Sequence, residues 1–113
     1  MSKIDAGQVE VDCGDQTYTL KPTVNAMLNI NRRYGDFRTA IERVVRADFD
    51  AIAYVVQEGA SLSKREAAAM QEHIFAAGIF NVAEPVADYL TILASGGREP
   101  GEEPSEGDGE GNS

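Results

Sequence analysis

The first forty residues constrain the fold most, because a two-stranded pattern in them leads directly into a helix. Residues 8–12 and 17–21 alternate between apolar and polar side chains with a period of two, which is typical of half-buried strands. Gly14 and Asp15 between them tolerate a positive φ and favour a tight turn. Two strands alone are marginal in water, so this β-hairpin must be covered by helices.

Three helices are predicted after the hairpin, each with a start signal and an amphipathic pattern. Their expected N-terminal positions are Pro22 or Thr23, Asp36, and Asp48 or Asp50. Gly35 is expected to end the first helix and Gly59 the third, since glycine adopts left-handed geometry at low cost. The apolar positions expected to face the core are Val24, Met27, Leu28 and Tyr34, then Phe37, Ile41, Val44 and Val45, and finally Ile52, Val55 and Val56.

Two further helices are predicted from capping boxes. Ser63 with Glu66 predicts a helix over residues 64–77 that Gly78 ends, and Asn81 with Glu84 suggests a second box with Pro85 in the first turn. The expected inner faces are Ala67, Met70, Ile74 and Ala77, and then Val82, Val86, Leu90 and Leu93. The sequence therefore predicts an α+β domain over residues 1–95, with an N-terminal β-hairpin followed by about five short helices packed as a small bundle.

Residues 96–113 form an acidic Gly/Glu/Pro tail without an apolar side chain to bury, so we expect them to be disordered. The net charge of the chain is −9. Six acids against Arg98 give the tail −5, which leaves −4 for residues 1–95. An acidic chain without a basic stripe is a poor match for a phosphate backbone, so we do not expect nucleic acid as a partner.

Cysteine content and hydropathy favour a soluble protein of a reducing cytoplasm. One cysteine excludes an intrachain disulfide framework, and the N-terminus lacks an apolar signal region. The longest apolar runs are far below the ~20 residues that cross a bilayer. We therefore expect no membrane partner.

The sequence contains few candidate residues for catalysis or for binding a metal or a cofactor. His73 has no second histidine with which to form a metal site or an acid–base pair, and acids beside Cys13 disfavour its thiolate. Asp48 and Asp50 lack the spacing of a calcium loop, and Gly96-Gly97 lacks the strand and helix of a phosphate loop. We expect no catalytic residue, no metal and no cofactor, and hence a protein that is not an enzyme.

One local charge pattern supports a hypothesis about the tail. Residues 32–46 carry a net charge of +3, from Arg32, Arg33, Arg38, Arg43 and Arg46 against Asp36 and Glu42. In an otherwise acidic chain this makes the protein electrically two-sided. The acidic tail could shield this arginine patch until a partner arrives; the alternative is a solvated helix face.

Several short motifs occur in a fixed order between about residues 6 and 93. They are Gly7-Gln8-Val9-Glu10-Val11; Tyr18-Thr19-Leu20-Lys21-Pro22-Thr23; Asn25-Ala26; Arg33-Tyr34-Gly35; Leu62-Ser63 with Glu66-Ala67; and Ala77-Gly78 before a last helix. In this order they resemble the tail assembly chaperones of long-tailed bacteriophages, in the branch shared with gene transfer agents.

The resemblance implies a small protein of the host cytoplasm that coats the apolar tape-measure protein, helps recruit tail-tube subunits and is absent from the mature virion. It implies no catalytic residue, and self-association stays open. The large apolar side chains that cannot all share so small a core are the candidate partner contacts, with the core as the competing location for each. They are Phe37, Tyr54, Phe75, Phe80 and Tyr89. The alternatives are a structural minor tail or tube component of the virion, and an acidic mimic of nucleic acid.

Overall fold

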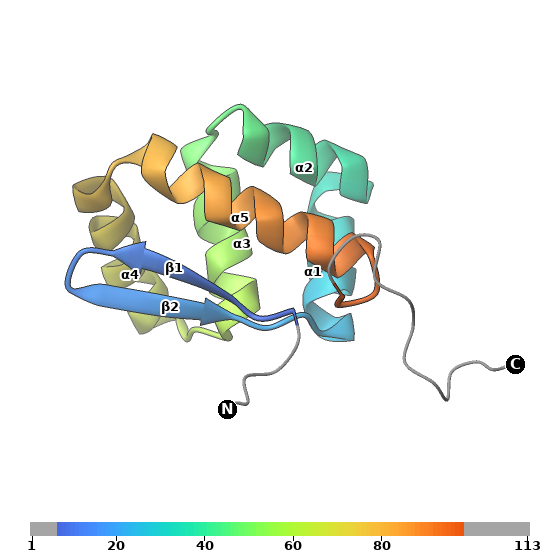
Figure 1. Ribbon diagram of the computed structural model, residues 1–113, viewed down its shortest axis with the longest axis horizontal. Helices are drawn as coiled ribbons and strands as arrows, with labels where there is room; N and C mark the ends of the chain where they lie inside the picture. Colours follow the sequence, from blue (N-terminus) through green and yellow to red (C-terminus); the bar gives the residue numbers. More distant parts are fainter. Residues whose placement is uncertain (1–6, 99–113) are drawn as a thin grey trace, which may run out of the picture.

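A computed structural model describes residues 7–98 of the chain, and the predictions made for residues 1–6 and 99–113 lie outside this described part. Its elements are β1 (Val9–Cys13), β2 (Gln16–Leu20), α1 (Val24–Tyr34), α2 (Phe37–Val45), α3 (Phe49–Ala60), α4 (Lys64–Ala77) and α5 (Ile79–Ala94). The predicted α+β class is confirmed, with a β-hairpin followed by five helices (Figure 1). No helix of this part is both long enough and apolar enough to cross a membrane.

The hairpin has the predicted antiparallel pairing and a two-residue loop. Cys13 lies opposite Gln16 next to the loop, and the pairing runs on to Val9 opposite Leu20. Gly14 takes the positive φ of 76° that this tight turn requires. One face of the sheet is buried through alternate residues, among them Val11, Cys13 and Leu20.

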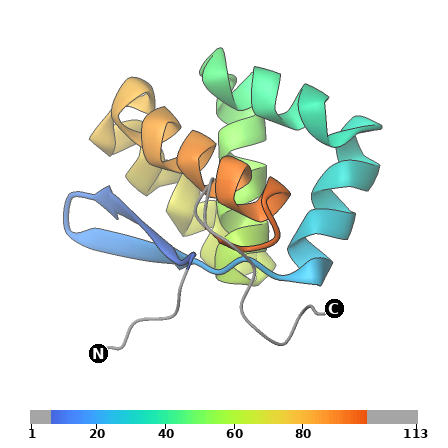
Figure 2. The ribbon, with the colours of Figure 1, turned by 45° about the vertical axis from the view of Figure 1, so that its right-hand side comes forward.

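The helices cover one face of this hairpin. Helix α3 runs through the middle of the domain and contacts the other four helices and β2, while α5 crosses it and packs on β1 (Figures 1 and 2). A continuous core lies between these elements. Its largest side chains without accessible surface are Tyr89, Leu20, Ile30, Ile52, Met70, Ile74 and Leu90.

Four of the predicted helix starts are confirmed. The side chains of Thr23, Asp36 and Asp48 each accept a hydrogen bond from a backbone N–H in the first turn of α1, α2 and α3. Ser63 and Glu66 form the reciprocal capping box that opens α4. These starts were predictable because capping depends on residues that are close in the sequence.

The prediction that Gly59 ends the third helix is wrong. Helix α3 continues to Ala60, and Ser61 takes the left-handed conformation, with φ 56° and ψ 50°. Gly59 is instead buried inside the helix, where an added Cβ would lie 3.0 Å from Cβ of Leu20 and 3.2 Å from Cε2 of Tyr89. The glycine is needed for close packing of α3 on the hairpin and α5.

The second capping box, Asn81 with Glu84, is also wrong. Helix α5 begins at Ile79, and its N-cap is Gly78, which lies three residues before Asn81 and has no side chain to accept a bond. The Asn81 side chain donates to the Ala77 carbonyl oxygen at 2.9 Å, so it bonds to the end of α4. Pro85 consequently lies inside α5 and not in its first turn, although the inner face of this helix is buried as predicted.

The prediction of which residues of α1 and α2 face the core is partly wrong. Val24 and Leu28 are 74% and 42% exposed, and the buried residues of α1 are Ala26 and Ile30. Val24 and Leu28 each lie two positions, or about 200° around the helix, from a buried residue, so these two side chains fall on the outer side. Met27 and Tyr34 pack against the core as predicted. In α2 the buried pair is Ala40 and Val44, whereas Val45 is exposed; Phe37 and Ile41 pack at the edge of the core.

The described chain continues past the predicted domain boundary at residue 95. The amide of Gly96 donates to the Leu93 carbonyl, and that of Gly97 donates to the Ile92 carbonyl at 2.9 Å. The Gly97 carbonyl oxygen lies so close to Gly7 that a Cβ on Gly7 would be 2.3 Å from it. The two ends of the described chain therefore meet at the C-terminus of α5.

Candidate protein-binding surface

The structure separates the five aromatic candidates into core and surface. Tyr89 has no accessible surface, and Phe37 and Tyr54 are half-buried against the core. Phe75 and Phe80 are 82% and 80% exposed. A partner could therefore cover the rings of Phe75 and Phe80 without any rearrangement of the domain, whereas the other three rings already pack against the core.

Phe75 and Phe80 flank the turn between α4 and α5. Phe75 follows Ile74, which belongs to the buried side of α4, so the Phe75 side chain leaves the helix about 100° from the core. Phe80 precedes buried Val82 by two residues, about 200° around α5. Ala76 is also exposed and Ile79 is half-buried. We name Phe75, Ala76, Ile79 and Phe80 the aromatic corner.

A second exposed apolar pair lies near the aromatic corner. Val45 at the end of α2 is 65% exposed, and Phe49 at the start of α3 is 37% exposed. Figures 1 and 2 both show the turn between α2 and α3 beside the first turns of α5. This end of the domain therefore carries four of the six large apolar side chains that are exposed within residues 7–98. The sequence pattern alone had assigned Val45 to the core.

Another apolar feature is a groove at the opposite end of α5. It has a volume of about 230 Å³ and is lined by Pro22, Val24, Met27 and Leu93 together with the glycines that follow α5. Drug-sized ligands occupy pockets of roughly 300–1,000 Å³. The groove is therefore smaller than a typical ligand pocket.

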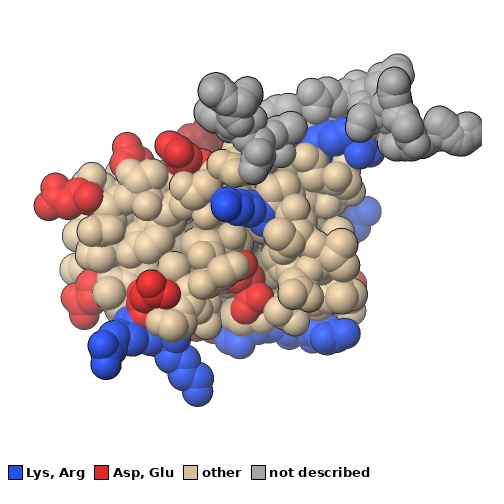
Figure 3. All heavy atoms as spheres, turned by 90° about the horizontal axis from the view of Figure 1, so that it is seen from below, with Lys and Arg blue, Asp and Glu red and all other residues tan. Residues whose placement is uncertain are grey.

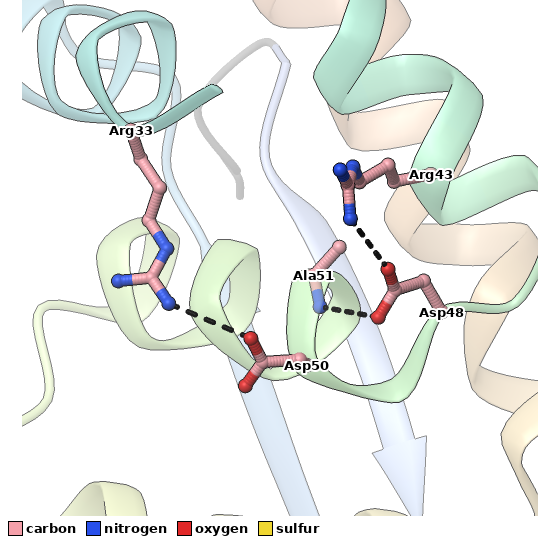
Figure 4. A network of polar contacts seen from close by, with 5 residues as sticks. All are labelled: Arg33, Arg43, Asp48, Asp50 and Ala51. Atoms are coloured by element: carbon pink, nitrogen blue, oxygen red, sulfur yellow. Dashed lines mark hydrogen bonds and ion pairs between the residues drawn. The ribbon is translucent and has the colours of Figure 1, made fainter. Parts of the chain in front are cut away.

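Two residues of the predicted arginine patch, Arg33 and Arg43, form ion pairs with neighbouring acids (Figure 4), and both lie near tyrosine rings. The Arg33 guanidinium lies 4.4 Å from the ring centroid of Tyr54 and 3.5 Å from an oxygen of Asp50. Arg43 forms an ion pair of 3.2 Å with Asp48, the residue that caps α3. Exposed pairs of this kind contribute little to stability.

Charges elsewhere do not form a single-sign field on the visible face. Figure 3 shows acidic and basic side chains on the same face, separated by uncharged surface. The hypothesis that the acidic tail shields the arginine patch concerns residues outside the described part and stays a prediction.

His73 takes part in a contact between two elements of the fold, and Cys13 lies in the core. The Tyr18 hydroxyl and Nδ1 of His73 are 2.6 Å apart, which joins β2 to α4. Cys13 is buried, and this burial, followed by the charge of Asp12, raises the pKa of its thiol above the usual value. A raised pKa lowers the thiolate fraction and hence the nucleophilicity of the sulfur.

No cluster of three or more His, Cys, Asp or Glu side chains suitable for a metal ion occurs within residues 7–98. Comparison with family models, with curated proteins and with solved structures finds no match to this chain. Within residues 7–98, the aromatic corner carries the two most exposed large apolar side chains, Phe75 and Phe80.

Proposed function

We propose that this chain is a phage tail assembly chaperone, which binds the hydrophobic tape-measure protein and helps recruit tail-tube subunits during tail morphogenesis. The observation that carries the proposal is the exposure of Phe75 and Phe80 on neighbouring helix ends. The sequence resemblance given above supplies the identity of the partners. The proposed location is the host cytoplasm, with the protein absent from the mature virion.

The physical requirements of this role agree with the aromatic corner. A chaperone that acts without ATP must bind apolar helix reversibly, by covering exposed apolar surface. Burying one exposed phenylalanine side chain contributes about 1.5–3 kcal/mol, so two rings contribute about 3–6 kcal/mol before the cost of association. Because association itself costs about 4 kcal/mol or more, the net contribution of the two rings is small, which favours reversible capture over permanent binding. The net charge of −9 helps to keep such a protein soluble.

Co-expression with the tape-measure protein tests the proposal. We expect the tape-measure chain to be soluble and to co-purify with this protein. The double variant Phe75→Ser/Phe80→Ser is expected to weaken binding by about a hundredfold or more, because about 3 kcal/mol or more of burial is lost.

The matched control is Val24→Ser/Leu28→Ser, which removes two exposed apolar side chains at the other end of the domain. This control is expected to bind as the wild type does. A tape-measure chain that stays insoluble beside the wild-type protein would refute the proposal. Abundant copies in purified particles, measured by mass spectrometry, would favour the alternative of a structural tail or tube component.

A further inference from the structure

The outer edge of β2 carries backbone groups that point away from β1. Cys13 and Gln16 flank the two-residue loop and form a hydrogen-bonded pair, so Gln16, Tyr18 and Leu20 bond to β1. The alternate residues Thr17 and Thr19 then direct their N–H and C=O groups outward.

The hydrogen bonds of Lys21 support the outward direction of the Thr17 and Thr19 backbone groups. Lys21 is the next alternate residue after Thr19, so its N–H and C=O groups should also point away from β1. Its amide donates to the Gly59 carbonyl oxygen at 3.0 Å, and its carbonyl accepts from the Tyr89 hydroxyl at 2.7 Å. Both partners lie outside the hairpin. Helix α3 therefore closes the edge at Lys21, and the open stretch is residues 16–19.

Nothing in the described part of the chain covers this open stretch. Figure 1 shows β1 on the side of α5, with α4 behind the hairpin on its helix-covered face, and Figure 2 shows no described element along the outer side of β2. The described backbone and side-chain groups form no hydrogen bond with the backbone of Thr17 or Thr19 across the outer edge. Thr17 is exposed and Thr19 is half-buried.

The edge also lacks the usual protection against pairing. Natural edge strands carry charges, proline or a bulge that prevent another strand from adding. β2 reads Gln-Thr-Tyr-Thr-Leu, with no charge and no proline, and it pairs with β1 residue for residue without a bulge. Threonine and tyrosine also favour extended structure. These properties are expected of a strand whose edge is covered in the working protein.

We propose that two copies of this chain associate through their β2 edges, antiparallel about a two-fold axis, and form a four-stranded sheet. Thr17 of one copy then lies opposite Thr17 of the other, and Gln16 lies opposite Tyr18. No like charges face each other in this register, and pairing centred on Thr17 keeps each copy clear of the α3 end at Lys21.

The shape of the resulting dimer follows from the symmetry. A two-fold axis perpendicular to the sheet places the helices of both copies on the same face. It also extends a marginal two-stranded sheet to four strands. The aromatic corner plays no part in this contact, so the inference does not depend on the proposed function.

The first test measures molecular mass in solution by light scattering after size exclusion. The wild-type protein is expected to be a dimer at high micromolar concentration. Thr17→Lys/Thr19→Lys is expected to be a monomer, because it places positive charges from both copies along the shared edge. Glu10→Lys/Asp12→Lys is the matched control: it adds lysines to the same sheet face on β1, away from the edge, and is expected to stay dimeric. A monomeric wild type would overturn the proposal, as would a dimeric Thr17→Lys/Thr19→Lys variant.

A second measurement needs no substitution. Hydrogen exchange at the Thr17 amide is expected to slow at least about tenfold as protein concentration rises from monomer to dimer conditions, because pairing with Thr17 of the other copy protects it. The Tyr18 amide is already paired with β1 and serves as the internal reference. Exchange at Thr17 that does not change with concentration relative to Tyr18 would overturn the proposal.

Discussion

The Tyr89 hydroxyl donates a hydrogen bond of 2.7 Å to the carbonyl oxygen of Lys21, which joins the last helix to the residue that leaves the hairpin. The amide of the same lysine donates to the Gly59 carbonyl of α3. Both backbone polar groups of Lys21 are thus satisfied by helices distant in sequence. This junction fixes the position of the hairpin relative to α3 and α5.

Tyr89→Phe is expected to lower the free energy of unfolding by about 1–3 kcal/mol at neutral pH, because it removes the bond and leaves the Lys21 carbonyl without its partner. Burial raises the pKa of Tyr89 far above its usual value. The folded state therefore keeps the proton that the unfolded state loses, and stability falls as the pH rises above about 10. Urea unfolding measures the free energy of unfolding at pH 7 and near pH 10.5. We expect it to fall less between these two pH values in the variant than in the wild type, and an equal fall in both would contradict this.

Gly59→Ala is expected to destabilise the protein by about 1–3 kcal/mol. In an exposed helix the same change would stabilise by roughly 1 kcal/mol. Here the new Cβ would lie 3.0 Å from Cβ of Leu20, which has no accessible surface and cannot move without displacing β2. Thermal unfolding of the variant decides the sign, and a raised melting temperature would show that the junction can relax.

Asp36→Asn is expected to reduce the sensitivity of the protein to acid. The backbone N–H of Thr39, and to a smaller extent Arg38, lower the pKa of the Asp36 carboxyl. A lowered pKa adds stability above the ordinary value of about 3.9, and this contribution is lost as the pH falls through the folded-state value. Asparagine caps as well as aspartate but does not titrate. The variant should match the wild type at pH 6 and lose less stability at about pH 3, as measured by urea unfolding followed by circular dichroism.

Phe75→Ser/Phe80→Ser is expected to change the free energy of unfolding by less than about 0.5 kcal/mol for each site, because both rings are already in water. Leu90→Ala, a core truncation on α5, is expected to cost about 2–5 kcal/mol. Chemical denaturation of both variants measures the contrast. A large loss in the double variant would mean that the aromatic corner packs within the domain.

The hairpin, the α4 capping box and the buried stripe of α5 were predictable because each depends on residues near one another in the chain. Gly14 at the turn and Ser63 with Glu66 are signals of this local kind. The same local rules failed at Gly59, which resembles a helix end in the sequence but is held inside α3 by contacts with Leu20 and Tyr89.

The sequence by itself determined the order and type of the elements, since capping, turn geometry and hydrophobic period act over a few residues. The tertiary structure decided which of the remaining large side chains are buried and which stay exposed. Tyr89 and Phe80 are both aromatic residues of α5, yet the first has no accessible surface and the second is 80% exposed. The difference depends on which side of α5 faces β1, α2 and α3, and packing between distant segments sets that orientation.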